Sequence, residues 1–299
     1  MAVRVRSTEQ LEHPVWRRMK SVLKIGELQG LVFKATDEQL VRAIRHPKET
    51  IELISLEAAE YDRRSEFLLP NIFPETEWLK KIAVARFLNA PLLLLTYGKN
   101  DRFLFRLHRV TLDRSFKPAA EEIDRFADEK SFVIWWASIK RLHQTKRTVE
   151  AKPRQRRTRF DRVIERHGFQ WGGNIDGFWM ANRPPYVRAI FEVRQTHRFP
   201  LDEYDPARFF SGTAKKGGDY KTWLPLVYLH RRYDLPLVLI TLNSREPDLF
   251  GFAEVQAVSE RELIYADQMP PGRNVTADIG LFKKWLERRV NRVKPNFLP

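Results

Sequence analysis

Two carboxylates in the second half of the chain have types and spacing that suit a divalent metal ion. Asp176 stands near the start of one apolar run and Glu192 stands within the next one. Strand periodicity places Glu192 and Arg194 on the same face of that second run. Residues 182–185, Asn-Arg-Pro-Pro, supply a turn, so the two runs are predicted to pair as a hairpin in which Asp176 approaches Glu192.

Converging carboxylates repel and raise each other's pKa unless a cation lies between them. Oxygen ligands of this kind suit Mg²⁺ or Mn²⁺, with waters in the remaining positions. A hydrated Mg²⁺ beside a basic residue generates hydroxide and stabilises a pentavalent phosphate, which is the chemistry of phosphodiester hydrolysis. Asp176 and Glu192 are therefore the predicted metal ligands. A hairpin with ordinary surface charges is the alternative interpretation of the same stretch.

The elements that position these acids belong to a chain that weakly repeats itself. Blocks beginning at Thr76 and Tyr220 each predict an amphipathic helix, a proline, a buried strand, a polar turn and a second strand. The repeat rests on three pairs at one constant offset: Trp78 and Trp223, Pro91 and Pro236, and Leu92 and Leu237. An earlier helix in each half starts near Val15 or Arg159.

The predicted fold class is therefore α/β, with two related halves that are each a mixed β-sheet flanked by helices. The expected domains are residues 1–148 and 149–299, because the boundary falls in the basic segment 140–159. Chance similarity between two α/β halves is the alternative.

A family resemblance follows from the order of the chemical residues in the second half. A helix with Glu165, then Asp176, then Glu192-Val193-Arg194, then a helix and a strand resembles the PD-(D/E)xK, or restriction-endonuclease-like, nuclease superfamily. The resemblance covers residues 159–244 and implies a restriction-endonuclease-like core, with the acids on a hairpin. It implies that Asp176 and Glu192 hold the metal, that Arg194 replaces the usual lysine, and that Glu165 is the acid of the first helix.

The sequence also departs from the family pattern. Arginine keeps the positive charge but does not readily lose a proton to act as a base. In the first half, Glu57 and Glu60 stand in the corresponding strand, but no aspartate-bearing strand precedes them, and a helical run at 35–49 takes that place. The first half is therefore expected to be a degenerate copy that serves as a scaffold or nucleic-acid platform.

Net charge predicts the partner. The chain has 53 Lys and Arg against 38 Asp and Glu, a formal charge of +15, which attracts polyanions such as nucleic acid. DNA is the expected polymer. The predicted backbone contacts lie in the basic segment and in the loop and helix after Glu192; Lys215, Lys216 or Lys221 is also a candidate to supply the amine that Arg194 lacks. The basic candidates are Arg154, Arg156, Arg157, Arg159, Lys215, Lys216 and Lys221.

The absence of cysteine excludes disulfides, thiolate zinc sites and a cysteine nucleophile, and it fits a reducing compartment. No apolar run approaches the ~20 residues of a membrane helix, so no membrane association and a cytoplasmic location are expected. The expected function is a metal-dependent nuclease that uses Mg²⁺ or Mn²⁺. The alternatives are a non-catalytic nucleic-acid-binding or assembly subunit with a nuclease-like fold, and a small-molecule or nucleotide-sensing α/β protein. Protein partners or a homo-oligomer stay open.

Overall fold

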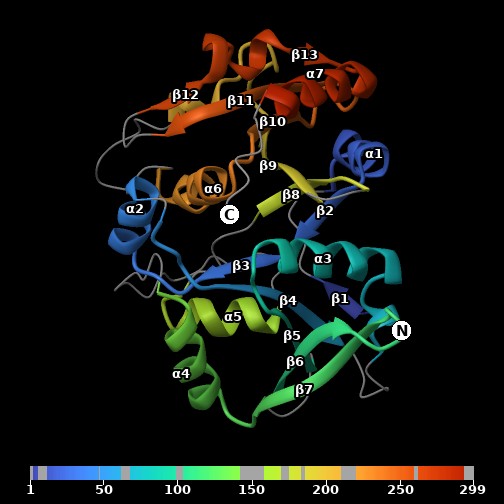
Figure 1. Cartoon of the computed structure of the whole chain (residues 1–299), viewed down its shortest axis with the longest axis vertical. Helices are drawn as coiled ribbons and strands as arrows, with labels where there is room; N and C mark the ends of the chain where they lie inside the picture. Colours follow the sequence, from blue (N-terminus) through green and yellow to red (C-terminus); the bar gives the residue numbers. More distant parts are fainter. Residues whose placement is uncertain are drawn as a thin grey trace. The chain divides into compact units, whose positions relative to one another are not determined.

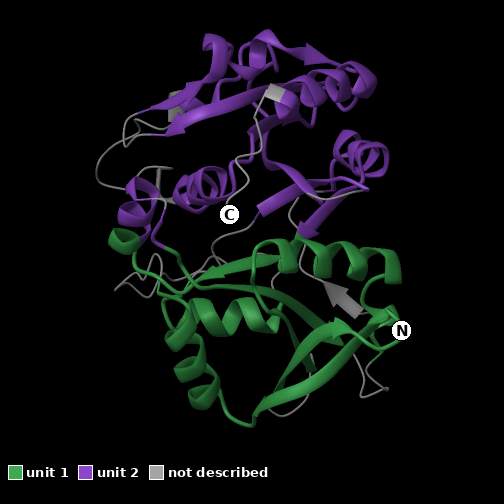
Figure 2. Ribbon diagram, viewed as in Figure 1, with its two compact units in different colours: residues 1–6, 28–39, 50–174 green, residues 7–27, 40–49, 175–299 purple. Residues whose placement is uncertain are grey.

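The chain forms two compact units, and neither is a continuous half of the sequence. The computed structural model describes residues 3–5, 12–46, 48–61, 68–98, 104–141, 158–169, 175–182, 186–209, 220–258 and 262–292. Unit 1 comprises residues 1–6, 28–39 and 50–174, and unit 2 comprises residues 7–27, 40–49 and 175–299 (Figure 2). Each unit has its own mixed β-sheet and helices, which confirms the predicted α/β class (Figure 1).

The sheet of unit 1 has six strands among the described residues. Its order is β1-β4-β5-β6-β7, and β3 also pairs with β4. The strands β4 and β5 are parallel and the other pairs are antiparallel. The strands are β1 (Val3–Val5), β3 (Gly30–Phe33), β4 (Leu53–Tyr61), β5 (Leu92–Gly98), β6 (Phe105–Leu112) and β7 (Pro118–Phe126). The helices are α3 (Glu75–Phe87), α4 (Glu129–Ile139), α5 (Arg159–Arg166) and the 3₁₀ turn η2 (Leu69–Asn71).

The sheet of unit 2 has seven strands in the described part of the chain. Its order is β12-β11-β10-β9-β8-β2, and β13 pairs with β11. The strands are β2 (Ile25–Leu28), β8 (Ile175–Met180), β9 (Val187–Thr196), β10 (Leu237–Asn243), β11 (Phe250–Val258), β12 (Leu263–Tyr265) and β13 (Val275–Thr276). The helices are α1 (Pro14–Leu23), α6 (Tyr220–Tyr233), α7 (Ile279–Arg292) and the 3₁₀ turns η3 (Pro206–Phe209), η5 (Ala266–Gln268) and η6 (Pro271–Arg273). Residues of α2 (Asp37–Arg45) are divided between the two units.

The repeat seen in the sequence corresponds to equivalent positions in the two units. Trp78 and Trp223 are each the fourth residue of their helix, α3 and α6. Leu92 and Leu237 are the first residues of β5 and β10. In both units this strand pairs in parallel with the strand before the helix and antiparallel with the strand that follows.

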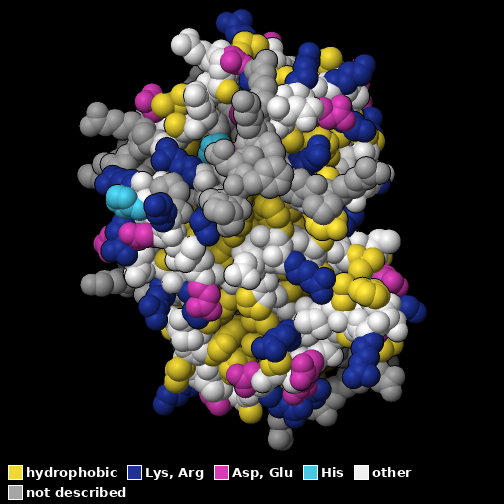
Figure 3. Space-filling view, in the orientation of Figure 1, with side chains coloured by type: hydrophobic (Ala, Val, Ile, Leu, Met, Phe, Trp, Pro, Cys, Tyr) yellow, Lys and Arg dark blue, Asp and Glu magenta, His cyan; other side chains and the backbone are white. Residues whose placement is uncertain are grey.

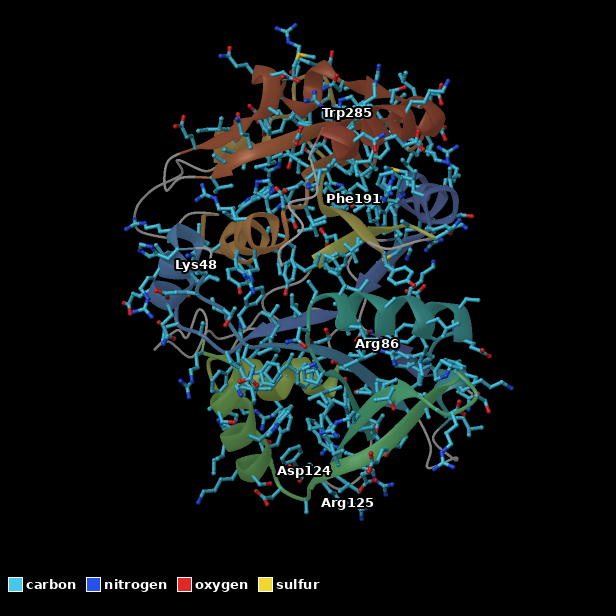
Figure 4. The ribbon with its side chains drawn as sticks, in the orientation of Figure 1. Lys48, Arg86, Asp124, Arg125, Phe191 and Trp285 are labelled. Carbon is cyan, nitrogen blue, oxygen red and sulfur yellow. The ribbon has the colours of Figure 1, made fainter. Side chains whose placement is uncertain are left out.

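The predicted domain limits, 1–148 and 149–299, differ from these units because the first helix of each half packs in the other unit. Helix α1 buries Val15, Trp16, Met19 and Leu23 in the core of unit 2, where the rings of Trp16 and Phe191 are 5.9 Å apart, edge to face. Figure 4 labels Phe191 on β9, together with Trp285 of α7, which packs against the same core.

Helix α5 is exchanged in the opposite direction. It buries Phe160, Val163 and Ile164 in the core of unit 1. Its first residue, Arg159, is fixed to that unit, because its backbone N–H donates to Glu60 on β4 (2.8 Å) and its guanidinium donates to the carbonyl of Gly98 on β5 (3.1 Å). An apolar helix face shows that a helix is buried, but it does not indicate which sheet the helix covers.

No helix in the described residues is both long and apolar enough to cross a lipid bilayer.

The exchange of helices predicts that the second half does not fold alone. Residues 149–299 lack α1 and β2, and removing even one large buried side chain typically costs about 2–5 kcal/mol against a total stability of about 5–15 kcal/mol. We expect fragment 149–299 to show no cooperative thermal transition by circular dichroism, and co-expression with fragment 1–148 to restore one. A cooperative transition of fragment 149–299 by itself would contradict the exchange.

Candidate metal and nucleic-acid site

The predicted pair Asp176 and Glu192 converges in unit 2. Strands β8 and β9 are antiparallel with Gly177 opposite Phe191. Asp176, one residue before Gly177, therefore lies opposite Glu192, one residue after Phe191. A carboxylate oxygen of Asp176 accepts from the backbone N–H of Val193, the residue after Glu192, at 2.8 Å. Both acids are buried, with exposed fractions of 4% and 8%. The hairpin therefore places two carboxylates side by side, away from bulk water.

Arg194 shares the face of Glu192, as strand alternation predicts. Its Nε lies 2.8 Å from a carboxylate oxygen of Glu192, and its guanidinium lies 5.6 Å from the ring centre of Trp223. A guanidinium over an indole face is a favourable cation–π arrangement. A further N–H of Arg194 lies 3.4 Å from the hydroxyl of Thr222. Arg194 is thus held between β9 and the start of α6.

A third acid, Glu27 on β2, comes from the exchanged N-terminal segment and was missed by the sequence analysis. Glu27 forms an ion pair with Lys20 of α1 at 2.6 Å and accepts from the indole N–H of Trp16 at 3.1 Å. The segment packs closely on β8, because a Cβ at Gly177 would lie 2.6 Å from the side chain of Ile25. Glu27 lies far from Asp176 in the sequence, so no local spacing indicated it.

The electrostatics of the site single out Asp176. Burial raises the pKa of Asp176 well above its ordinary value, and the charge of Glu192 adds to this effect. The Val193 N–H and Arg194 lower that pKa, whereas Glu27 raises it further. Among the described residues Asp176 takes part in no ion pair, while Glu192 has Arg194 and Glu27 has Lys20. Asp176 is therefore the carboxylate at which a proton or an added cation is most stabilising.

The donor set fits Mg²⁺ or Mn²⁺, which proteins bind through one or two carboxylates while waters keep the other positions. Within the described ranges, no group of three or more His, Asp or Glu side chains has the arrangement of a complete metal cage. Asp176 and Glu192 would supply two oxygen ligands to such an ion, and waters or substrate oxygens would have to supply the others.

Unit 1 has the same glutamate in the same place. Glu57 on β4 lies opposite Leu94 on β5, and Glu192 on β9 lies opposite Leu239 on β10. Leu94 and Leu239 are each the third residue of their strand. Glu57 is therefore the structural equivalent of Glu192, and Ala59 is the equivalent of Arg194.

As expected, no aspartate-bearing strand precedes Glu57, but a hairpin strand without an aspartate does. Strand β3 pairs with β4, and Gln29 immediately before it corresponds to Asp176, because Gly30 lies opposite Leu56 as Gly177 lies opposite Phe191. The side chain of Gln29 accepts from the backbone N–H of Ala58 at 2.7 Å, the same contact that Asp176 makes with Val193. Helix α2 lies between β3 and β4 in the sequence, so no short turn indicated that these two strands pair.

The cation of unit 1 is supplied by a helix. The ammonium of Lys81 on α3 lies 3.1 Å from a carboxylate oxygen of Glu57, and the side chains of the two are 2% and 0% exposed. Lys81 also lies 4.5 Å from the ring centre of Phe73. Burial raises the pKa of Glu57, and the charge of Lys81 opposes this effect. The unit 1 pair thus carries its own fixed cation.

The other predicted residues either belong to unit 1 or have side chains outside the described part of the chain. Glu165 lies on α5, which belongs to unit 1, and Arg159 caps the sheet of unit 1 through Glu60 and Gly98. Lys221 lies in α6, but its side chain is outside the description. Three predicted basic residues of the linker and two of the loop after β9 also lie outside the described ranges: Arg154, Arg156, Arg157, Lys215 and Lys216.

Figure 3 shows Lys and Arg side chains over the visible face of both units, with Asp and Glu side chains among them. No protein-family model, curated protein or solved structure matches the chain.

The raised pKa of Asp176 predicts that Asp176→Asn stabilises the metal-free protein at neutral pH. An unfolded aspartate ionises near pH 4, whereas the folded one stays protonated to higher pH. The wild type therefore loses stability as pH rises between these two pKa values, and the asparagine variant does not. Urea unfolding in chelator from pH 4 to pH 8 should show a gap that widens with pH and closes near pH 4. Asp248→Asn, at an exposed acid of the same unit, should leave the profile unchanged. A gap that does not vary with pH would contradict the raised pKa.

The buried pair of unit 1 predicts a double-mutant result. Lys81→Met should destabilise the protein by about 3–5 kcal/mol, because it leaves the Glu57 carboxylate buried without a cation. Adding Glu57→Gln should recover most of that loss, as measured by urea unfolding of all four variants. The neighbouring Lys80→Met, at a partly exposed lysine that lies 3.8 Å from Glu77, should change stability by less than about 1 kcal/mol. Equal losses from the single and double variants would show that the pair is not coupled.

Proposed function

We propose that the protein is a divalent-metal-dependent nuclease that hydrolyses phosphodiester bonds of nucleic acid, with DNA as the expected substrate. Asp176 and Glu192 of unit 2 are its metal ligands. The observation that carries this proposal is the buried pair itself, in which two carboxylates adjoin and one of them has no ion-pair partner in the described chain. The resemblance to PD-(D/E)xK nucleases and the charge of +15 support the same function.

The roles of the chain's own residues follow from their contacts. When bound, Mg²⁺ or Mn²⁺ supplies a Lewis acid and an acidified water at a phosphate. Arg194 is partly exposed, at 26%, and its guanidinium is oriented by Glu192 and Trp223, so it can donate to a phosphate oxygen. Arginine does not act as a base, so its role is to stabilise negative charge. The absence of cysteine accords with a cytoplasmic enzyme.

A second function, non-catalytic nucleic-acid binding, is favoured by one specific contact. The guanidinium of Arg194 lies 2.8 Å from Glu192 and already neutralises one of the two proposed ligands. In that case Arg194 plays the part in unit 2 that Lys81 plays in unit 1. Metal binding separates the two functions, because only the nuclease requires it.

The proposed function predicts that cleavage and metal binding disappear together. Asp176→Ala or Glu192→Ala should lower the rate of plasmid or single-stranded DNA cleavage by at least about 100-fold and abolish the heat of Mn²⁺ binding in calorimetry. Arg194→Lys should keep activity, since it restores the basic group that the resembled family usually has. Chelation should stop the reaction. Wild type that binds nucleic acid but neither binds Mn²⁺ nor cleaves would establish the second function instead.

A further inference from the structure

The hairpin between β6 and β7 of unit 1 ends in a rigid three-residue turn. The backbone N–H of Asp113 donates to the carbonyl of Lys117 at 2.8 Å, and the N–H of Phe116 donates to the carbonyl of Asp113 at 3.1 Å. One carboxylate oxygen of Asp113 accepts from the N–H groups of Ser115 and Lys117, at 2.8 and 2.9 Å. Four hydrogen bonds therefore fix the conformation of the turn.

The residue at the tip of this turn conflicts with its local conformation. Phe116 has a φ of 59°, in the left-handed region, where such loops normally place glycine. A bulky residue there costs about 1–2 kcal/mol. Burial does not offset this cost, because Phe116 is 78% exposed, the highest value among the exposed large hydrophobic residues of the described chain. A phenylalanine that is both strained and exposed is explained by contact with something outside the chain.

The charges around Phe116 indicate a polyanion. Arg114 and Lys117 flank it and are exposed, whereas the exposed Arg109 of the adjoining strand β6 lies opposite Glu121 of β7. The acid of the turn, Asp113, is engaged by the two backbone N–H groups. An aromatic ring between basic side chains is the arrangement that binds single strands, since every base presents a π-face and every nucleotide a phosphate.

We propose that the β6–β7 tip is a nucleic-acid contact in which Phe116 stacks on an unpaired base while Arg114 and Lys117 bind the adjoining phosphates. The inference rests on the proposed nucleic-acid substrate, and it adds a second point of attachment, on unit 1, for the same polymer. It assigns single-stranded or locally unpaired nucleic acid as the form that binds there. In this proposal the strained backbone of Phe116 is retained because the hydrogen-bonded turn holds the ring toward solvent, where a base can stack on it.

The test separates strain from binding by using Phe116→Gly. Glycine removes the ring and suits the left-handed backbone, so the melting temperature should stay the same or rise. The affinity for a labelled single-stranded oligonucleotide, measured by fluorescence anisotropy in chelator, should fall about 5- to 150-fold, the loss of stacking on one base. Phe116→Trp should restore the affinity. Ile134→Ala, at a 61% exposed residue on α4, is the matched control and should bind as wild type.

Salt dependence identifies the two kinds of contact. Phe116→Gly should leave the slope of log K against log[salt] unchanged, whereas Lys117→Ala should reduce its magnitude by about 0.7, the value for one single-strand phosphate. If Phe116→Gly binds the oligonucleotide as tightly as wild type, the inference is overturned and the nuclease proposal is unaffected. If Phe116→Gly weakens binding but the wild type cleaves no nucleic acid, the inference holds and the nuclease proposal fails. Dissociation of a dimer by Phe116→Gly, with nucleic-acid affinity unchanged, would assign the tip to a protein contact instead.

Discussion

Each unit buries a glutamate at the same position, Glu57 on β4 and Glu192 on β9, and the need to neutralise this buried charge shapes both sites. Removing an ionised carboxylate from water costs several kcal/mol unless a cation lies beside it. In unit 1 the cation is Lys81, which is as buried as Glu57 itself. In unit 2 the cation is Arg194, which stays partly exposed, and Asp176 adds a second carboxylate that Arg194 does not neutralise. Unit 1 is therefore internally balanced, whereas unit 2 has a second carboxylate that either a proton or an added cation can neutralise.

The exchange of α1 and α5 joins the two halves of the chain in building these sites. Glu27 and Lys20 reach the acids of unit 2 only because α1 and β2 belong to that unit, and Gly177 provides the space for their close approach. In the other direction, the first residue of α5 satisfies Glu60, an acid on the strand of Glu57. A duplicated fold in which each copy borrows a helix cannot be divided at the middle of its sequence.

The sequence predicted the features that depend on residues close together in the chain. It did not predict which helix packs on which sheet. The hairpin of Asp176 and Glu192 follows from strand periodicity and a proline-rich turn, and the repeat follows from paired tryptophan and proline positions. Gln29 was missed because α2 interrupts its hairpin. The helix that carries Glu165, α5, belongs to unit 1, and an amphipathic pattern does not state which sheet a helix covers. Glu27, whose charge acts on Asp176, was missed because it comes from the distant N-terminal segment.

The identity of the basic group in unit 2 constrains any chemistry there. Arg194 keeps its proton at every accessible pH, and Lys20 is committed to Glu27, so neither is suited to accept a proton from water. Asp176 is the group whose protonation changes most readily, because burial and Glu192 favour its neutral form. A carboxyl must lose its proton before it binds a metal, so the metal affinity of the proposed site is expected to rise with pH as Asp176 ionises. Unit 1 has no such dependence, since Lys81 keeps Glu57 paired within the fold.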